Sequence, residues 1–120
     1  MDIKGKDFLS TGDFTTAELT SLIDLAAKIK AREYHDKPLA GRSIALVFFN
    51  PSLRTRTSME VAIYELGGNA TALDIGKGTW SLEYREGVVM DGDKTEHIIE
   101  AARVLSRYVA GIGVRAFPEM

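Results

Sequence analysis

The sequence contains no cysteine, which excludes disulfides, thiol catalysis and cysteine-based zinc sites. It contains only two histidines, and because they are isolated from each other we expect neither a metal site nor a metal cofactor. A run of about eighteen apolar residues, the minimum for a membrane span, is also missing. Residues 1–6 lack the apolar core of a signal peptide. These absences together favour a cytoplasmic protein.

No excess of charge of either sign is present. Fifteen basic and seventeen acidic residues give a net charge of -2, which argues against a partner that is nucleic acid or a membrane surface. A hydrophobic fraction of 45% and a charged fraction of 27% are typical of a globular protein in water. The length of 120 residues suits one ordinary domain with one core, spanning residues 1–120.

Helical and strand-like patterns alternate along the chain. Apolar residues recur at helical spacing over residues 16–32, 52–66 and 96–108. Apolar, strand-like runs occupy residues 43–49, 69–74 and 111–117. Because helices alternate with strands, we predict an α/β fold in which a parallel sheet is flanked by helices.

Three local features refine this prediction. Thr15 and Glu18 fit a capping box at the start of the first helix, whose apolar stripe we expect to pack on a sheet. In the third helix we expect His97 in the first turn, as an ordinary polar residue, and an inward-facing set of Ile98, Ile99, Ala102 and Leu105. Residues 75–95 are rich in glycine and show no convincing period, and a loop of that length indicates function or a missing partner.

The junction at residues 48–58 carries the most chemical information. An apolar strand stops at Asn50-Pro51 and a helix begins at once, so free amides and a partial positive charge would face an anion. Ser52 can either cap this helix or bond a phosphate oxygen, and Thr55 points to the same end. Arg54 offers a planar fork of donors suited to phosphate. Local chemistry alone favours anion binding and plain helix capping equally.

Two further arginines bear on this junction. Arg56 lies two residues after Arg54, roughly 200° around the helix, so we do not expect both to grip the same oxygens. We expect Arg56 either to brace the loop or to face an interface. Arg115 lies late in the third strand, and ligands of parallel sheets bind where strands end. Two separate parts of the sequence therefore deliver cations to one edge.

The segment Ser52-Leu53-Arg54-Thr55-Arg56 resembles the S-x-R-T-R signature of the aspartate/ornithine carbamoyltransferase superfamily. Four stretches of the sequence resemble the N-acylornithine branch, which uses acetyl- or succinyl-ornithine. They are residues 48–58, Trp80 with residues 90–93, residues 96–97 and residues 112–115. The resemblance runs from about residue 8 to residue 118. It implies an incomplete N-terminal, carbamoyl-phosphate-binding domain of such an enzyme.

The resemblance also implies roles for individual residues. Carbamoyl phosphate would be held by Ser52, the backbone amide of Leu53, Arg54, Thr55, Arg115 and Trp80. Arg54, Thr55 and Arg115 would be the catalytic groups, Arg54 at the departing phosphate and the other two at the carbonyl oxygen. The reaction would carbamoylate the side-chain amine of an N-acylornithine in arginine biosynthesis, giving N-acylcitrulline and phosphate. It would need no cofactor and no metal.

Trp80 is implied to act across a subunit boundary. In the family it reaches from a long loop into the active site of a neighbouring subunit of a homotrimer. The alternative for a lone tryptophan is a local core position.

Two departures from the family pattern affect the predicted function. The downstream H-P-x-Q and H-C-L-P motifs are absent, so the second, amino-acid-binding domain is missing and catalysis by residues 1–120 alone is not expected. Acetyl-type members carry Glu at the position of Thr95, so acyl selectivity stays open with a lean away from strict acetyl preference. Two alternatives stand: a plain ornithine carbamoyltransferase, against which Trp80 argues, and a non-catalytic module that binds an anion or associates with other subunits.

Overall fold

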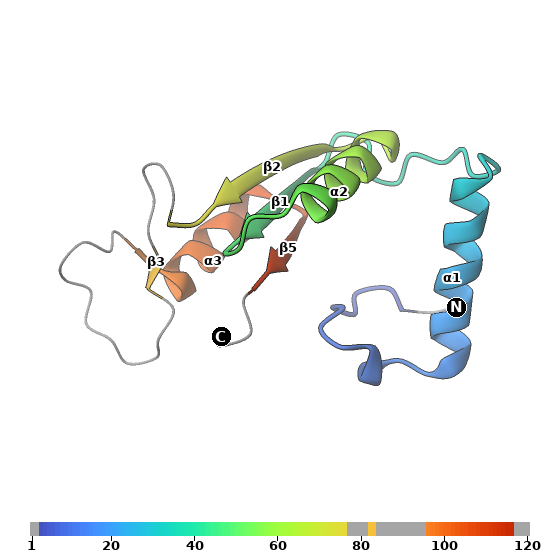
Figure 1. Ribbon diagram of the computed structural model, residues 1–120, viewed down its shortest axis with the longest axis horizontal. Coiled ribbons are helices and arrows are strands. Elements are labelled where there is room, and N and C mark those ends of the chain that lie inside the picture. Colours follow the sequence, from blue (N-terminus) through green and yellow to red (C-terminus); the bar gives the residue numbers. More distant parts are fainter. Residues whose placement is uncertain (1–2, 77–81, 84–95, 117–120) are drawn as a thin grey trace. The chain divides into compact units, whose positions relative to one another are not determined.

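The computed structural model describes residues 3–76, 82–83 and 96–116 (Figure 1). Its elements are η1 (Thr11–Asp13), α1 (Thr16–Lys30), β1 (Ser43–Phe48), α2 (Leu53–Glu65), β2 (Asn69–Asp74), β3 (Leu82–Glu83), β4 (Glu96–His97), α3 (Ile98–Tyr108) and β5 (Gly111–Arg115). They belong to two compact units, Met1–Asp36 and Lys37–Met120. No helix within the described ranges is long and apolar enough to cross a membrane.

A three-stranded parallel sheet organises the second unit, with strand order β2-β1-β5. The central strand β1 pairs with β2 from Ser43↔Asn69 to Phe48↔Asp74, and with β5 as far as Phe48↔Arg115. In Figure 1, α2 lies in front of this sheet and α3 lies behind it. The predicted parallel α/β fold is therefore confirmed.

The core of this unit lies between β1 and α2. Residues 45–48 of β1 are all buried, because a central strand with helices on both sides has no face open to water. Leu46 and Phe48 form the core cluster with Ile63 of α2. Gly113 lets α2 approach β5 closely, since a Cβ added there would lie 3.2 Å from both Leu46 Cδ2 and Met59 Cε.

Helix α2 ends as its glycines predict. Gly67 has a φ of +93°, a conformation that favours glycine. Its N–H donates to Tyr64 O over 3.0 Å, and the N–H of Gly68 donates to Ile63 O over 2.9 Å. This pair of bonds is a Schellman motif, which satisfies two carbonyls at the end of the helix and turns the chain into β2.

The first unit carries α1 and the turn before it. The capping box is confirmed, because Glu18 N–H donates to Thr15 Oγ1 over 3.1 Å while Thr15 N–H donates to Glu18 Oε1 over 2.8 Å. The hydrogen bond from the Thr15 N–H to the carboxylate lowers the pKa of Glu18. No residue of α1 is buried, and Ile23 is 69% exposed, so the packing of its apolar stripe on a sheet stays a prediction.

The start of the third helix was predicted wrongly. Glu96 and His97 form β4, which pairs in parallel with β3, so α3 begins only at Ile98 and His97 is not in its first turn. A two-residue strand is too short to leave a recognisable period in the sequence. Trp80 and Thr95 lie outside the described residues.

The inward face of α3 also differs from the prediction. Ala101 is the buried residue of this helix, with Ile98 and Leu105 half-buried on the same stripe. Ile99 is 49% exposed and Ala102 is exposed as well. Apolar residues occur on more than one side of α3, so spacing alone did not identify the buried stripe.

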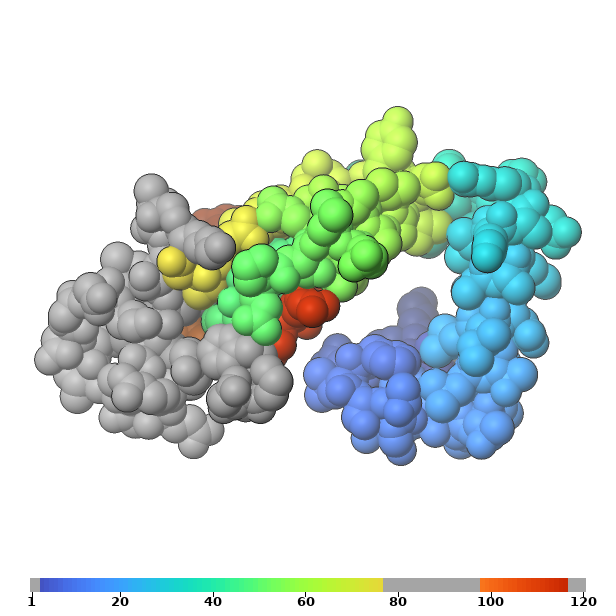
Figure 2. All heavy atoms as spheres, viewed as in Figure 1, coloured from blue at the N-terminus to red at the C-terminus, as the bar shows by residue number. Residues whose placement is uncertain are grey.

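The space-filling view shows the outer surface of α2, in green, facing solvent (Figure 2). Two leucines of this unit form a matched pair for mutation. Leu46 in β1 is 1% exposed, and Leu53 in α2 is 80% exposed. We expect Leu46→Ala to lower the free energy of unfolding by about 2–5 kcal/mol, because it removes buried apolar surface and leaves a cavity. Leu53→Ala should change it by less than about 0.5 kcal/mol. Urea denaturation measures both, and equal losses would contradict this core.

Candidate anion-binding site

The site begins at the N-terminus of α2, directly after β1. Ser52 is the N-cap residue, with an extended backbone at φ -155°, and its Oγ accepts the Thr55 N–H over 3.2 Å. Of the two roles left open for Ser52, the structure shows capping. An Oγ that accepts this bond still carries its own proton, so capping leaves a donor for a ligand. The remaining amides of the first turn have no partner within the helix.

The last register position of the sheet places three residues in one row. Phe48 of β1 is paired with Asp74 of β2 on one side and with Arg115 of β5 on the other. We call these three residues the end row. Residues at one register position of parallel strands point to the same face of the sheet. The end row therefore faces the first turns of α2.

Thr55 covers one end of the end row. Arg115 Nη1 donates to Thr55 Oγ1 over 3.0 Å, although the two residues are 60 positions apart in the sequence. This contact confirms that the helix start and the third strand bring their polar groups to the same edge. Arg54 is exposed beside them, and within the described residues its guanidinium has no hydrogen bond or ion pair.

Arg56 covers the other end of the end row. Its Nη1 contacts Asp74 Oδ2 at 2.6 Å, its Nε contacts Glu60 Oε1 at 3.4 Å, and its guanidinium lies 5.9 Å from the centre of the Phe48 ring. The hydrogen bond to Asp74, and then the attraction of that carboxylate, raise the pKa of Arg56 above its ordinary value. Arg56 therefore braces the end of β2 against α2, where we had expected it to brace the loop or to face an interface.

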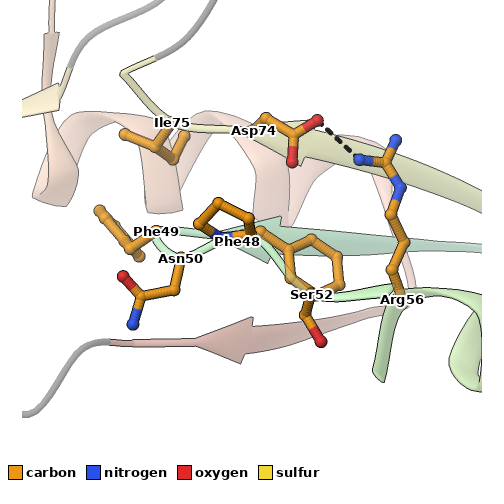
Figure 3. A pocket seen from close by; sticks show the side chains of 8 residues that line it. Phe48, Phe49, Asn50, Ser52, Arg56, Asp74 and Ile75 are labelled. Carbon is orange, nitrogen blue, oxygen red and sulfur yellow. Dashed lines mark hydrogen bonds and ion pairs between the residues drawn. The ribbon is translucent and has the colours of Figure 1, made fainter. Parts of the chain in front are cut away.

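A cavity of about 240 Å³ opens beside the helix start (Figure 3). It is lined by Phe48, Phe49, Asn50, Pro51, Ser52, Arg56, Asp74 and Ile75. Ser52 belongs both to the cavity lining and to the helix start, whereas Arg54 and the Thr55–Arg115 contact lie outside the lining.

The predicted site residues thus fall into two groups. Ser52, Leu53, Arg54 and Thr55 form the start of α2, and Arg115 joins them from β5. The Leu53 side chain is 80% exposed, so a role for Leu53 would lie in its backbone amide. Trp80 and Thr95 belong to the part of the chain that the structure does not describe. Sequence reasoning missed Asp74, although its place at the end of a predicted strand was a usable signal.

Comparison with known proteins shows the family to which the chain belongs. Residues 6–120 match the family model "Aspartate/ornithine carbamoyltransferase, carbamoyl-P binding domain". N-acetylornithine carbamoyltransferase of Xanthomonas campestris pv. campestris is 55% identical over 114 residues, which cover 95% of this chain and 33% of that protein. N-succinylornithine carbamoyltransferase of Bacteroides fragilis is 50% identical over 76 residues, covering 63% of this chain and 24% of that protein.

Solved structures agree with the sequence comparison. A crystal structure of acetylornithine transcarbamylase complexed with acetylcitrulline matches with a TM-score of 0.86 and 55% identity, over 95% of this chain and 34% of that one. The chain spans about a third of the length of the N-acetylornithine carbamoyltransferases that it matches. Its sequence match, its parallel sheet and its α2 start lead to the same conclusion. The chain belongs to the aspartate/ornithine carbamoyltransferase family, within the carbamoyl-phosphate-binding domain.

Proposed function

We propose that the chain binds carbamoyl phosphate at the start of α2, as the N-terminal part of an N-acylornithine carbamoyltransferase. The observation that carries the proposal is the Arg115–Thr55 hydrogen bond beside the capped helix start. It brings a second arginine to the amides and to Arg54. A phosphate with an adjacent carbonyl needs such a divided site, with donors for the anion and a separate pair for the carbonyl oxygen.

Each group has a place in this proposal. The phosphate oxygens accept hydrogen bonds from the Ser52 hydroxyl, the Leu53 amide and the guanidinium of Arg54. Amides at a helix start favour such an anion through their partial positive charge. Thr55 and Arg115, which already contact each other, donate to the carbonyl oxygen.

The proposed reaction needs positioning and charge stabilisation and no nucleophilic side chain. The acceptor amine attacks the carbonyl carbon, forming a C–N bond and an oxyanion. The C–O bond to phosphate then breaks, phosphate leaves with the electron pair, and the nitrogen loses a proton. Removing one donor from an oxyanion typically lowers the rate by about 10²–10³. Arg54 stabilises the phosphate as its charge grows.

The identity of the acceptor is supported by the order of the relatives. The N-acetylornithine carbamoyltransferase of X. campestris is 55% identical, whereas the ornithine carbamoyltransferase of Deinococcus radiodurans is 41% identical. This difference favours an N-acylated acceptor over free ornithine. We propose that the complete protein acts in the cytoplasm, in arginine biosynthesis, and makes N-acylcitrulline. A non-catalytic anion-binding module is the second candidate, favoured by the exposure of Arg54 and Arg115 within the described residues.

Arg54→Ala tests the anion site. We expect it to weaken carbamoyl phosphate binding by about tenfold to a hundredfold, because hydrogen bonds to a charged group contribute about 1.5–3 kcal/mol. Titration calorimetry with carbamoyl phosphate, and with inorganic phosphate as competitor, measures the loss. Arg103→Ala, at an exposed position of α3, is the matched control and should bind normally. Wild-type protein that shows no phosphate-competable binding at millimolar ligand would refute the site.

Sedimentation of the full-length protein tests the proposed homotrimer. We expect a trimer whose active site includes Trp80 of a neighbouring subunit. Trp80→Ala should therefore lower activity. Mixing it with an inactive Arg54→Ala variant should restore part of that activity, because some sites of a mixed trimer combine an intact Arg54 from one subunit with an intact Trp80 from its neighbour. The absence of restored activity in mixed trimers would contradict a shared site, and a strict monomer would contradict the trimer.

Thr95→Glu tests acyl selectivity in the full-length enzyme. The carboxylate of a succinyl acceptor should be repelled by Glu and tolerated by Thr, since like charges brought together cost several kcal/mol. We expect kcat/KM for N-succinylornithine to fall at least about tenfold relative to N-acetylornithine. Thr95→Gln, which has nearly the same shape without the charge, is the control. Carbamoylation of free ornithine in preference to both acyl forms would overturn the branch assignment.

A further inference from the structure

We propose that Arg56 is a positioning residue for this site, and that its task is to neutralise the Asp74 carboxylate at the edge of the sheet where the phosphate binds. The inference rests on the proposed phosphate site at the start of α2. It concerns a side chain that does not itself hold the ligand. Arg56 keeps a negative charge of the scaffold from opposing an anionic substrate.

The end row places Asp74 close to the proposed ligand. Asp74 and Arg115 flank Phe48 at one register position of neighbouring parallel strands. With strands about 4.8 Å apart, their backbones are separated by about 10 Å. This distance exceeds the Debye length of about 8 Å at physiological ionic strength, but it is well within the length of about 30 Å at 0.01 M salt, so at low ionic strength the carboxylate acts on an anion near Arg115. A bare Asp74 would therefore repel phosphate.

The guanidinium of Arg56 is held where it can neutralise the Asp74 carboxylate. Its Nη1 lies 2.6 Å from Asp74 Oδ2, and its Nε lies 3.4 Å from Glu60 Oε1. In Figure 3 the Arg56 side chain extends toward Asp74, and the dashed line marks that contact. With both of these nitrogens engaged by carboxylates, the guanidinium is committed to the β2 side of the site. Arg54, one residue before Thr55, is left to the ligand.

Exposure separates this electrostatic role from a role in folding. The side chains of Arg56, Asp74 and Glu60 are 38%, 44% and 42% exposed. Ion pairs with that much water around them contribute little to folding stability. Loss of Arg56 should therefore weaken anion binding while leaving the fold in place.

The test is a rescue experiment on the full-length protein, with inorganic phosphate as the calorimetric probe. Arg56→Met keeps a flexible, unbranched side chain and removes the charge. At about 0.01 M ionic strength we expect it to weaken phosphate binding about tenfold, because the carboxylate of Asp74 is left uncompensated, and the loss should shrink at physiological salt. Adding Asp74→Asn in the same chain should recover most of that loss. The loss caused by Arg54→Ala should be the same with and without Asp74→Asn, because it comes from a missing ligand donor and not from the Asp74 charge.

Three results would overturn the inference. Unchanged phosphate affinity in Arg56→Met would mean that Asp74 does not reach the site. Binding in the double variant as weak as in Arg56→Met would mean that Arg56 itself holds the anion or the fold. If Arg56→Met does not fold in thermal unfolding, Arg56→Lys decides: its ammonium should keep phosphate affinity within about threefold, and a tenfold loss would contradict charge compensation. Absence of binding by the wild type would instead refute the proposed function.

Discussion

The register of the parallel sheet is the constraint on which the site depends. Phe48 is the last residue of the central strand, and pairing on both sides fixes Asp74 and Arg115 at the same height. A shift of either outer strand by one residue would turn its terminal side chain to the other face of the sheet. A shift of β5 would lose the Arg115–Thr55 contact, and a shift of β2 would lose the Arg56–Asp74 contact. The same pairing holds the buried residues of β1 in the core, so core packing and site geometry share one register.

The same row also explains how one short helix segment uses two arginines differently. Arg54 and Arg56 leave the helix roughly 200° apart, so only one of them can serve a ligand at a given point. Asp74 is the last residue of β2, and Arg56 lies on the side of α2 that contacts it. Arg54 is left exposed and available for an anion. Charge complementarity within the scaffold thus assigns the two side chains their tasks.

Much of this arrangement follows from the sequence because its signals are local. The apolar run before Asn50 gave β1, and the cap residues Thr15 and Ser52 gave two helix starts. The meeting of Arg115 with the start of α2 followed from a general property of parallel sheets, without any knowledge of the partner atom. These inferences succeeded because each depended on a pattern of a few residues or on one rule of topology.

The failures have a common physical origin in contacts between distant segments. Whether Arg56 would meet Asp74 or an interface depends on the register of β2 against β1, which no local pattern encodes. The strand formed by Glu96 and His97 exists only through its pairing with β3. In α3, burial of Ala101 in place of Ala102 depends on how the helix lies against the sheet. Such orientations are settled by packing after the elements form.

The exposure of the site bears on the reaction that we propose for it. Arg54 and Arg115 are both exposed within the described structure. In water an ion pair at about 4 Å is stabilised by only about 1 kcal/mol, whereas the same pair at a partly shielded protein surface gains about 4 kcal/mol. The described residues therefore suit reversible phosphate binding better than stabilisation of a transition state. For the proposed reaction, rate enhancement would need further groups that exclude water from Arg54 and Arg115, because donors stabilise developing charge most strongly in a site without water.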